Sequence, residues 1–454
     1  MGRSVAIVRT IRPVSVPSVP PHLPGTRSAL DAAERADPRG HAMHVVAAAV
    51  WAFLQSLTNA GEGIAWGVLA AVALARVPKV WRCYRAPVRD PVFLALLGWS
   101  AWMPLTVLWG PDLLPADRPL APERWVLTPL LLWPVMARPW LVLGAMGVGA
   151  TVQVGLALAW SWTGAGWARY VDMRSLSNFG QLVWQVSTAA TLAGVALRFT
   201  PWKGKGPLAV AWAAGMLAVA LTAVRTAMVS LLVALAVVAA RPRWRRRPSA
   251  WVIAAAAVAL LGAASSMVMM SPAMERIQAS FDRAQRLETF EVDGQEALLE
   301  AVSSSRLTLA RAAIDMGIEH PVFGGGRGSF RVELPRWAVR RMAQDPDWAP
   351  LSAPLTDGTL SDAHNALLQA WAEGGIPAVL LISYALFGLG WRLWKQSAYD
   401  RPAAAAMALF SLVLVAVPVS IVTAKAPGAI IATCLAVSWA VSSEPARRVL
   451  EREP

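Results

Sequence analysis

The sequence predicts an all-α protein that crosses a membrane many times, and three observations support this. Of its 454 residues, 56% are hydrophobic and only 15% are charged, which is too little polar surface for a water-soluble globule of this size. The 23 Trp and 33 Pro fit a membrane protein, because Trp concentrates at the lipid–water interface and membrane helices tolerate Pro. Apolar runs of bilayer length recur along the chain, so we expect about 12 transmembrane spans.

The chain begins with a polar segment. Residues 1–40 are rich in Arg and Pro and contain no apolar core of signal-peptide length, so we expect a disordered cytoplasmic tail. Nine apolar runs follow, near 42–57, 63–77, 92–109, 125–137, 140–162, 179–199, 207–222, 226–240 and 251–270. Three more come after a long polar passage, near 376–391, 403–421 and 427–442.

These runs define the expected organisation of the chain. It comprises a tail (1–40), transmembrane helices 1–9 (41–270), a periplasmic loop (271–365), transmembrane helices 10–12 (366–442) and a second cytoplasmic tail (443–454). Lys and Arg collect in alternate connections, at 79–89, 138, 198–205, 241–247, 392–401 and 447–448. Because these residues favour the cytoplasmic side, both termini are expected there, in a multi-pass protein of the cell inner membrane.

The net charge of +14 has the same explanation. Its basic residues lie in short runs between apolar segments, as membrane orientation signals do, so we expect membrane lipids and no nucleic acid as partners.

The periplasmic loop is predicted to contain amphipathic helices and one tight turn. Apolar residues at near-helical spacing predict a first surface helix: Met274, Ile277, Phe281 and Leu287. Ser303–Ser305 can cap a second helix that ends before Pro321, and its expected apolar face comprises Leu307, Ala310 and Ile314. Segment 331–341 surrounds Trp337 with basic residues and is expected at the membrane interface. Gly324–Gly328 must form a turn where chain segments approach closely.

His364 is the main candidate for catalysis. It precedes a helix that is expected to re-enter the membrane, with Asp362 two residues earlier and Asn365 directly after it. Imidazole exchanges its proton near neutral pH, so it suits general-base work or hydrogen bonding to a reacting hydroxyl. An ordinary histidine at a helix start would give the same local pattern.

Three arginines are candidates for holding phosphate. Arg225 is flanked tightly by apolar sequence near the outer membrane edge, where an ionisable residue is costly. Arg306 and Arg327 are also candidates for binding phosphate, since a guanidinium group binds phosphate oxygens in a fork. A snorkelling anchor for Arg225, or a solvated surface role for the other two, is the alternative.

The remaining polar candidates are weaker. Arg174, Asn178 and Gln181 could contact a sugar or simply cap a helix, and Asp362 and Asn365 could contact the glycan or the acceptor. The sequence shows no His and carboxylate cluster with metal-site spacing, so we expect neither a metal nor another cofactor.

Three segments together resemble the O-antigen ligase and O-antigen polymerase superfamily of membrane glycosyltransferases. They are Val-Arg-Thr-Ala around Arg225, an Arg306-led helix that leads into Pro-Val-Phe-Gly-Gly-Gly-Arg-Gly-Ser-Phe, and His-Asn-Ala-Leu-Leu-Gln-Ala-Trp-Ala-Glu-Gly-Gly-Ile-Pro from His364. The charged Arg327 within the glycine run and the long insert at 331–361 depart from the usual pattern of the family.

The resemblance implies a function. Members take a glycan from a polyisoprenoid (undecaprenyl) diphosphate carrier and join it to an acceptor hydroxyl on the periplasmic face. It implies diphosphate binding by Arg225 and Arg306, which match family positions, and a catalytic role for His364. Lipid A core is the expected acceptor, and polymerisation of the glycan or transfer to a protein hydroxyl are the alternatives. A multi-span transporter or flippase is the alternative from another class, and it would predict ionisable groups near mid-span and internal symmetry.

Overall fold

The fold was analysed in a computed structural model. The structure describes residues 26–57, 59–111, 124–162, 179–199, 205–221, 225–239, 306–344, 355–356, 362–398, 400–416 and 425–442. These residues form helices and turns, and no strand occurs among them. The predicted all-α class is therefore confirmed for the described part of the chain.

Nine helices precede the long loop in the described part of the chain, and all but α1 correspond to a predicted apolar run. They are α1 (Thr26–Ala36), α2 (Pro38–Leu54), α3 (Asn59–Val80), α4 (Pro91–Leu105), α5 (Arg124–Leu132), α6 (Pro139–Trp162), α8 (Phe179–Phe199), α9 (Lys205–Leu221) and α10 (Arg225–Ala239). Short 3₁₀ turns join or extend several of them: η1 (Trp81–Arg85), η2 (Pro87–Arg89), η3 (Thr106–Leu108) and η4 (Trp133–Val135).

The later helices form the rest of the described chain. They are α14 (Arg306–Glu319), α15 (Ser329–Gln344), α17 (Ala366–Gln396), α18 (Arg401–Ala416) and α19 (Lys425–Ser442). In the described part, four helical stretches are long and apolar enough to cross a membrane: Ala60–Arg85, Pro91–Leu108, Pro139–Leu156 and Ala366–Gln396. Shorter apolar helices accompany them, so the expected number of 12 spans is not confirmed. The run at 251–270 and the predicted surface helix from Met274 to Leu287 lie outside the described residues.

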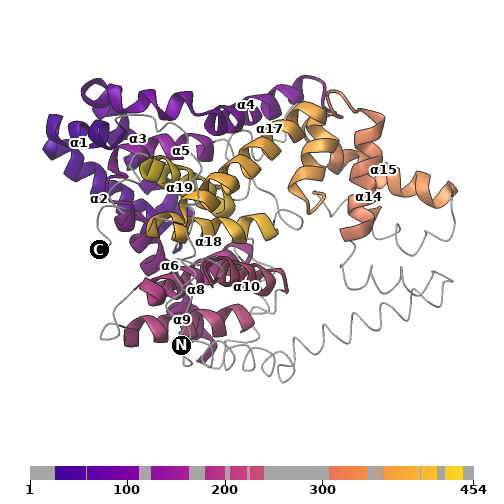
Figure 1. The fold of residues 1–454 in the computed structure, drawn as a ribbon. Coiled ribbons are helices and arrows are strands. Elements are labelled where there is room, and N and C mark those ends of the chain that lie inside the picture. Colours follow the sequence, from indigo (N-terminus) through magenta and orange to yellow (C-terminus); the bar gives the residue numbers. More distant parts are fainter. Residues whose placement is uncertain are drawn as a thin grey trace, which may run out of the picture.

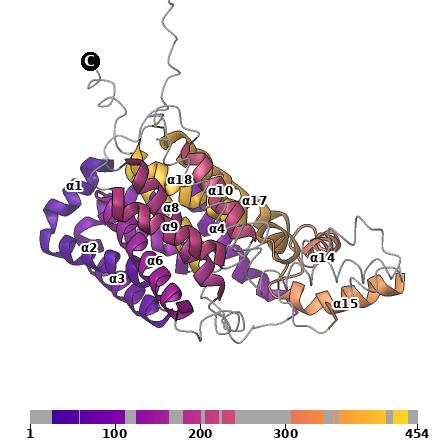
Figure 2. The ribbon, with the colours of Figure 1, turned by 90° about the horizontal axis from the view of Figure 1, so that it is seen from below.

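The main core is built around α18 and α19, whose described side chains are almost all buried. A helix that is hydrophobic on all sides is buried, either among other helices or in lipid. Helices α5, α8, α10 and α17 provide most of the contacts with this pair. Helices α6, α8, α9 and α10 share a second core beside it, and the two views of the ribbon show these helices grouped against the central pair (Figures 1 and 2).

Asp90 fastens three helices of the main bundle together. It caps the start of α4 by accepting a hydrogen bond from the Val92 amide at 2.9 Å, and its carboxylate accepts from Arg392 Nη2 of α17 at 2.7 Å. The indole of Trp439 on α19 donates to the same carboxylate. Burial alone would raise the pKa of Asp90, but these donors, led by Arg392, hold that pKa below its ordinary value.

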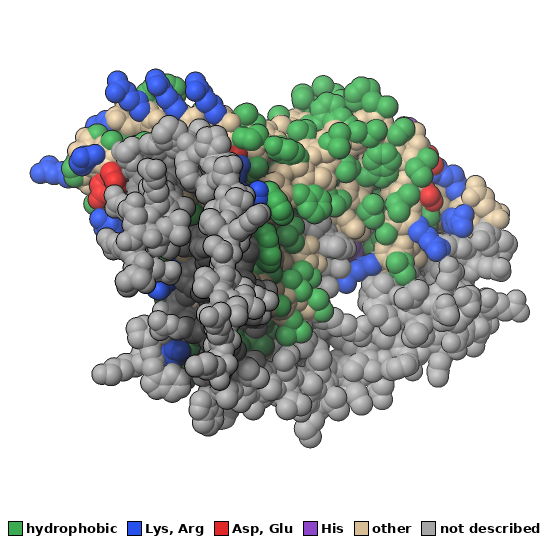
Figure 3. All heavy atoms as spheres, viewed as in Figure 1, with side chains coloured by type: hydrophobic (Ala, Val, Ile, Leu, Met, Phe, Trp, Pro, Cys, Tyr) green, Lys and Arg blue, Asp and Glu red, His purple; other side chains and the backbone are tan. Residues whose placement is uncertain are grey.

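A small outer unit stands at one end of the bundle. Helices α14 and α15 and the start of α17 share their own apolar core, which includes Leu309, Met316, Phe330 and Trp337. Both ribbon views place this unit at the end opposite α1 (Figures 1 and 2). The space-filling view shows Lys and Arg side chains near the α1 end, hydrophobic side chains across the middle, and charged side chains again on the outer unit (Figure 3).

The structure corrects the expected tail at 1–40, because α1 and the start of α2 make residues 26–36 and 38–40 helical. Leu30 and Ala33 are buried in contact with the bundle, and the Asp37 side chain caps α2 by accepting from the Gly40 amide. The contacts of α1 include residues distant in sequence, in α3 and α19, so local composition did not reveal them. Residues 1–25 lie outside the described part of the chain.

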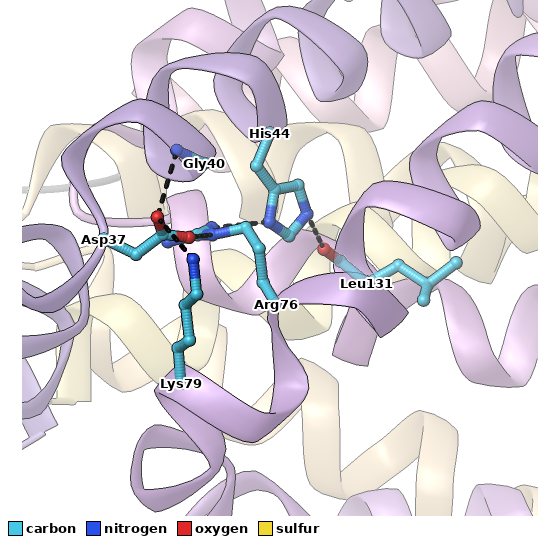
Figure 4. Close-up of polar contacts among 6 residues, drawn as sticks. All are labelled: Asp37, Gly40, His44, Arg76, Lys79 and Leu131. Carbon is cyan, nitrogen blue, oxygen red and sulfur yellow. Dashed lines mark hydrogen bonds and ion pairs between the residues drawn. The ribbon is translucent and has the colours of Figure 1, made fainter.

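Asp37 also anchors a buried polar network, drawn in Figure 4. Arg76 of α3 donates from Nε to Asp37 Oδ2 (3.2 Å), and its Nη1 lies 2.7 Å from His44 Nδ1. The other ring nitrogen of His44 lies 2.7 Å from the Leu131 carbonyl oxygen, and Lys79 lies 3.4 Å from Asp37 Oδ1. This network, which we call the His44 cluster (Asp37, His44, Arg76, Lys79 and the Leu131 carbonyl), joins α2, α3 and α5.

The structure contradicts one expectation for the outer unit and leaves another as a prediction. The buried face of α14 comprises Thr308, Leu309, Ala312, Ala313, Met316 and Gly317, whereas Leu307 and Ile314 are exposed. Trp337 is buried in the core of the outer unit and donates to Asp315 Oδ2 at 3.0 Å. Its indole therefore packs inside the unit, and the expected position of segment 331–341 at a membrane interface stays a prediction.

Candidate functional site

The site is built on a break in helix α17. Gly375 has φ +64° and ψ −160°, so the helix before it ends and a second helix begins after it. A helix end leaves backbone carbonyls without partners within the helix. The glycine-rich turn supplies those partners, because Gly325 N donates to Ala372 O (2.8 Å) and Gly326 N donates to Glu373 O (3.0 Å).

Two further bonds complete the break. The Trp102 indole of α4 donates to the Gly374 carbonyl at 2.8 Å, and the Ile376 amide donates to Pro321 O at 3.0 Å. Helix α4, the turn and both halves of α17 are thus hydrogen-bonded to one another at a single point.

Glycine is required where these segments touch. Gly324 has φ +72°, and a Cβ there would lie 2.4 Å from the Glu373 carbonyl carbon; a Cβ on Gly326, at φ +90°, would lie 2.3 Å from Gly110 Cα. Side chains would have to displace backbone atoms at both positions, and φ in this region already disfavours them. The sequence-based interpretation of Gly324–Gly328 as a close chain approach is confirmed.

His364 lies just before the first half of α17, in a strained conformation. Its φ of +48° is the only positive value at a non-glycine residue in the described chain, and such strain costs roughly 1–3 kcal/mol. Asp362 supports the bend because its Oδ1 accepts from the His364 amide at 2.8 Å and lies 3.2 Å from His364 Nδ1. The His364 side chain is 39% exposed, and its Nε2 has no hydrogen-bond partner among the described residues.

Asn365 has a structural role next to His364. Its side-chain oxygen accepts from the amides of Leu367 (3.0 Å) and Leu368 (3.1 Å), which makes it the N-cap of α17. The cap holds His364 at a fixed point relative to the helix. A glycan contact by Asn365 remains a prediction, and its side-chain oxygen is already used.

Helices α14 and α17 lie side by side and run in the same direction. The Trp371 indole donates to Ile314 O at 3.3 Å and lies against Gly317, where a Cβ would overlap it. Further along both helices, Ile376 bonds to Pro321. Increasing residue number on one helix therefore corresponds to increasing number on the other.

This register brings Arg306 and His364 to the same end of the helix pair. Arg306 precedes Ile314 by eight residues, or about 12 Å, and Asn365 precedes Trp371 by six, or about 9 Å, at about 1.5 Å per residue. The first turn of α14 is therefore close in level to the bend at His364. The sequence, in which 58 positions separate the two residues, gave no sign of this proximity.

Arg306 suits an anionic ligand. Its side chain is partly buried, and burial lowers the pKa of its guanidinium group. No described residue forms a hydrogen bond or ion pair with it. It stands at the start of α14, where free amides and the helix dipole also favour negative charge.

The structure describes the other predicted site residues in less detail. Arg327 lies in the glycine-rich turn near Glu373, with which it interacts electrostatically, rather than at the start of α14. Arg225 begins α10 and Gln181 lies in the first turn of α8, but their side chains, and all of Arg174 and Asn178, lie outside the described residues. Within the described part, no group of three or more His, Cys, Asp and Glu residues is arranged to hold a metal ion.

Sequence reasoning gave no role to two polar residues of the site, Gln369 and Glu373. They are four residues apart on one face of α17, and the Gln369 amide donates to Glu373 Oε1 at 2.6 Å. Glu373 is only 7% exposed. The available signal was a Gln and a Glu at helical spacing in a segment that is otherwise mostly apolar.

Comparison with known families places this site in context. Residues 208–383 match the family model Wzy_C, described as O-antigen ligase. The match contains α10, the outer unit and the first half of α17, and it includes Arg225, Arg306, Arg327 and His364. A search of curated proteins finds no match. Its apolar helices mark the chain as an integral membrane protein. Residues 208–383 are similar to the O-antigen ligase family, and the resemblance predicted from the motifs is confirmed.

Proposed function

We propose that the protein is an O-antigen ligase that transfers a glycan from undecaprenyl diphosphate to a hydroxyl of lipid A core on the periplasmic face of the inner membrane. One observation carries this proposal: the α14–α17 register brings Arg306 and the exposed ring of His364 to the same helix ends within the family-matched segment.

The donor end of the site would hold the diphosphate. Two parallel helices present their N-terminal ends together, and each end carries partial positive charge. Arg306 adds a guanidinium group that no described residue engages, and Arg225, at the start of α10, is proposed to add a second. Arg327, beside Glu373, is proposed to contribute to the electrostatic field rather than to bind the diphosphate directly.

The acceptor end would contain His364. In the proposed step, Nε2 takes the proton of the acceptor hydroxyl as its oxygen bonds to the anomeric carbon of the donor sugar. The bond from that carbon to the diphosphate breaks, and its electron pair leaves with the diphosphate. Arg306 stabilises the charge that develops there, so neither a metal nor ATP is needed in this scheme.

The acceptor is tested by deleting the gene and separating the surface polysaccharides on a gel. A ligase acting on lipid A core predicts full-length glycan that stays on its lipid carrier. Shortened glycan would identify a polymerase instead, and unchanged polysaccharide with an under-glycosylated protein would identify transfer to protein. Wild-type polysaccharide and protein glycosylation would overturn the proposal.

The donor site is tested with Arg306 variants in purified membranes that contain undecaprenyl diphosphate-linked glycan and lipid A core. Arg306→Ala should nearly abolish transfer, and Arg306→Lys should recover little, because a point charge does not reproduce the guanidinium fork. Arg311→Lys, on the exposed side of α14, is the matched control and should transfer at the parental rate. Full activity in Arg306→Ala would remove Arg306 from the site.

A further inference from the structure

A chain of hydrogen bonds connects the glycine-rich turn to the bend that carries His364. The Gly328 amide and Gln369 Nε2 both donate to the carboxylate of Glu373, the latter at 2.6 Å. Gln369 Oε1 accepts from the Ala363 amide at 2.7 Å. Ala363 directly precedes His364 in the sequence, so this chain of hydrogen bonds ends one residue before the imidazole.

The chain has only one favourable arrangement. Gln369 must turn its carbonyl oxygen toward the Ala363 amide and its NH2 group toward the Glu373 carboxylate. Reversing the side-chain amide would place a donor against a donor and an acceptor against an acceptor. The orientation of Gln369 is therefore fixed by its two partners.

The bend needs such support. His364 has φ +48°, and strained backbone persists only where its surroundings hold it. Asp362 accepts from the His364 amide and so fixes the bend itself. Asn365 accepts from the amides of Leu367 and Leu368 and so fixes the residues after it. Gln369 holds the residue before it, so the bend is restrained on both sides.

Glu373 connects this support to the rest of the outer unit. It is buried, and a buried carboxylate is stable only with donors or a counter-charge nearby. The Gly328 amide, Gln369 and the charge of Arg327 provide these, and the adjoining Gly326 amide bonds to the Glu373 backbone carbonyl. The turn therefore holds Glu373 through both its side chain and its main chain.

We propose that Gln369 and Glu373 are positioning residues, which fix the His364 imidazole relative to the outer unit and do not touch substrate. This inference rests on the proposed function for its effect on catalysis. The effect on the backbone at Ala363 is independent of any activity.

Exchanging the residues at positions 369 and 373 tests the chain of hydrogen bonds. Gln369→Glu alone places two carboxyl groups side by side, and Glu373→Gln alone replaces one of the two acceptor oxygens that the Gly328 amide and Gln369 use with a donor NH2 group. In the double variant Gln369→Glu/Glu373→Gln, the carboxylate at 369 can accept from Ala363 and from the new amide at 373, whose oxygen can accept from Gly328. Both end bonds are then restored with unchanged total charge.

Transfer is measured with undecaprenyl diphosphate-linked glycan and lipid A core, and backbone exchange of the 362–368 peptide is followed by mass spectrometry. We expect each single variant to lower kcat about 10- to 100-fold, since small displacements of a catalytic group have effects of this size. KM should change little, exchange in the peptide should rise, and the double variant should recover most of both. Gln344→Glu, on the exposed end of α15, is the control and should change neither.

The two readouts separate the inferences. If the parental protein transfers no glycan, the proposed function fails, and the exchange pattern still tests the hydrogen-bond chain. Unchanged exchange and kcat in Gln369→Glu would overturn the positioning role. A double variant that is no better than the single variants would also overturn it.

Discussion

Two histidines of the described chain lie in polar clusters that contain an aspartate, and their surroundings differ in an instructive way. His44 is fully buried, and both of its ring nitrogens are engaged, by Arg76 and by the Leu131 carbonyl. His364 is 39% exposed, and Asp362 faces only its Nδ1.

The partners determine the protonation of His44. Because Arg76 can only donate, His44 Nδ1 must accept, and the ring proton must be on Nε2, where it is donated to Leu131. That ring has no capacity left for a substrate. His364 differs because its Nε2 has no partner in the described part of the chain. A histidine in such a cluster therefore indicates chemistry only when one ring nitrogen is both free and accessible.

The largest expected effect comes from breaking the His44 cluster. Arg76→Met should destabilise the protein by about 3–5 kcal/mol, because it removes the partner of a largely buried Asp37 carboxylate and leaves His44 Nδ1 without a donor. Thermal unfolding in detergent measures this. Lys79→Ala is the control, since Lys79 is 62% exposed and its ion pair contributes less than about 1 kcal/mol. Equal melting temperatures for Arg76→Met and the parent would show that the cluster is not structural.

His364→Ala tests the other half of the comparison. Loss of a general base lowers the rate about a hundredfold or more, or about 2.7 kcal/mol in activation free energy. The melting temperature should change little or rise, because the variant removes an exposed side chain from a strained position. His364→Gln distinguishes a base from a hydrogen-bonding group that only orients the acceptor, since the latter would retain most activity. Parental transfer rates in His364→Ala would make His364 an ordinary helix-start residue.

His44→Ala should give the opposite pattern to His364→Ala. It leaves buried donors of Arg76 and the Leu131 carbonyl without partners, which costs about 1–3 kcal/mol. Transfer per folded molecule should equal that of the parent. We would measure melting temperature and rate on the same detergent-purified samples. A variant that folds stably but transfers slowly would contradict the assignment of His44 to structure.

The smallest expected effect is a loss of stability in acid. Burial alone would raise the pKa of Asp37, but its hydrogen bonds, led by that from Arg76, hold this pKa below the ordinary value of 3.8. A lowered folded-state pKa stabilises the protein above the unfolded-state pKa, and this contribution is lost as the pH falls through the folded-state value. Melting temperatures from about pH 6 to about pH 3 should therefore fall less steeply in Asp37→Asn than in the parent. Parallel curves would contradict the shift.

Sequence patterns predicted the membrane helices better than the polar contacts. Apolar runs located α6 and α8 almost to the residue, because burial in lipid requires a continuous apolar stretch. They missed α1, whose stability depends on contacts with residues far along the chain. They also gave the wrong face of α14, because exposed Leu307 and Ile314 follow helical spacing as regularly as the buried residues do.

The candidate site was predicted in part. The motifs led to Arg306 and His364, but only the fold shows that parallel packing of α14 and α17 brings them to one level. The chain of hydrogen bonds through Gln369 and Glu373 depends on side-chain orientation, which a sequence does not specify. The break at Gly375 had a signal in Gly374-Gly375-Ile376-Pro377, since Gly and Pro together commonly interrupt a helix.

The break at Gly375 also has a mechanical consequence. Membrane-spanning helices tilt when bilayer thickness changes, and an unbroken α17 would carry such a tilt directly to His364. Here the segment before Gly375 is bonded to the glycine-rich turn and packed on α14. We therefore expect the half of α17 after Gly375 to pivot about the point where Ile376 is bonded to Pro321, while the bend at His364 keeps its register with the first turn of α14. Such a pivot would insulate the proposed site from the thickness of the surrounding lipid.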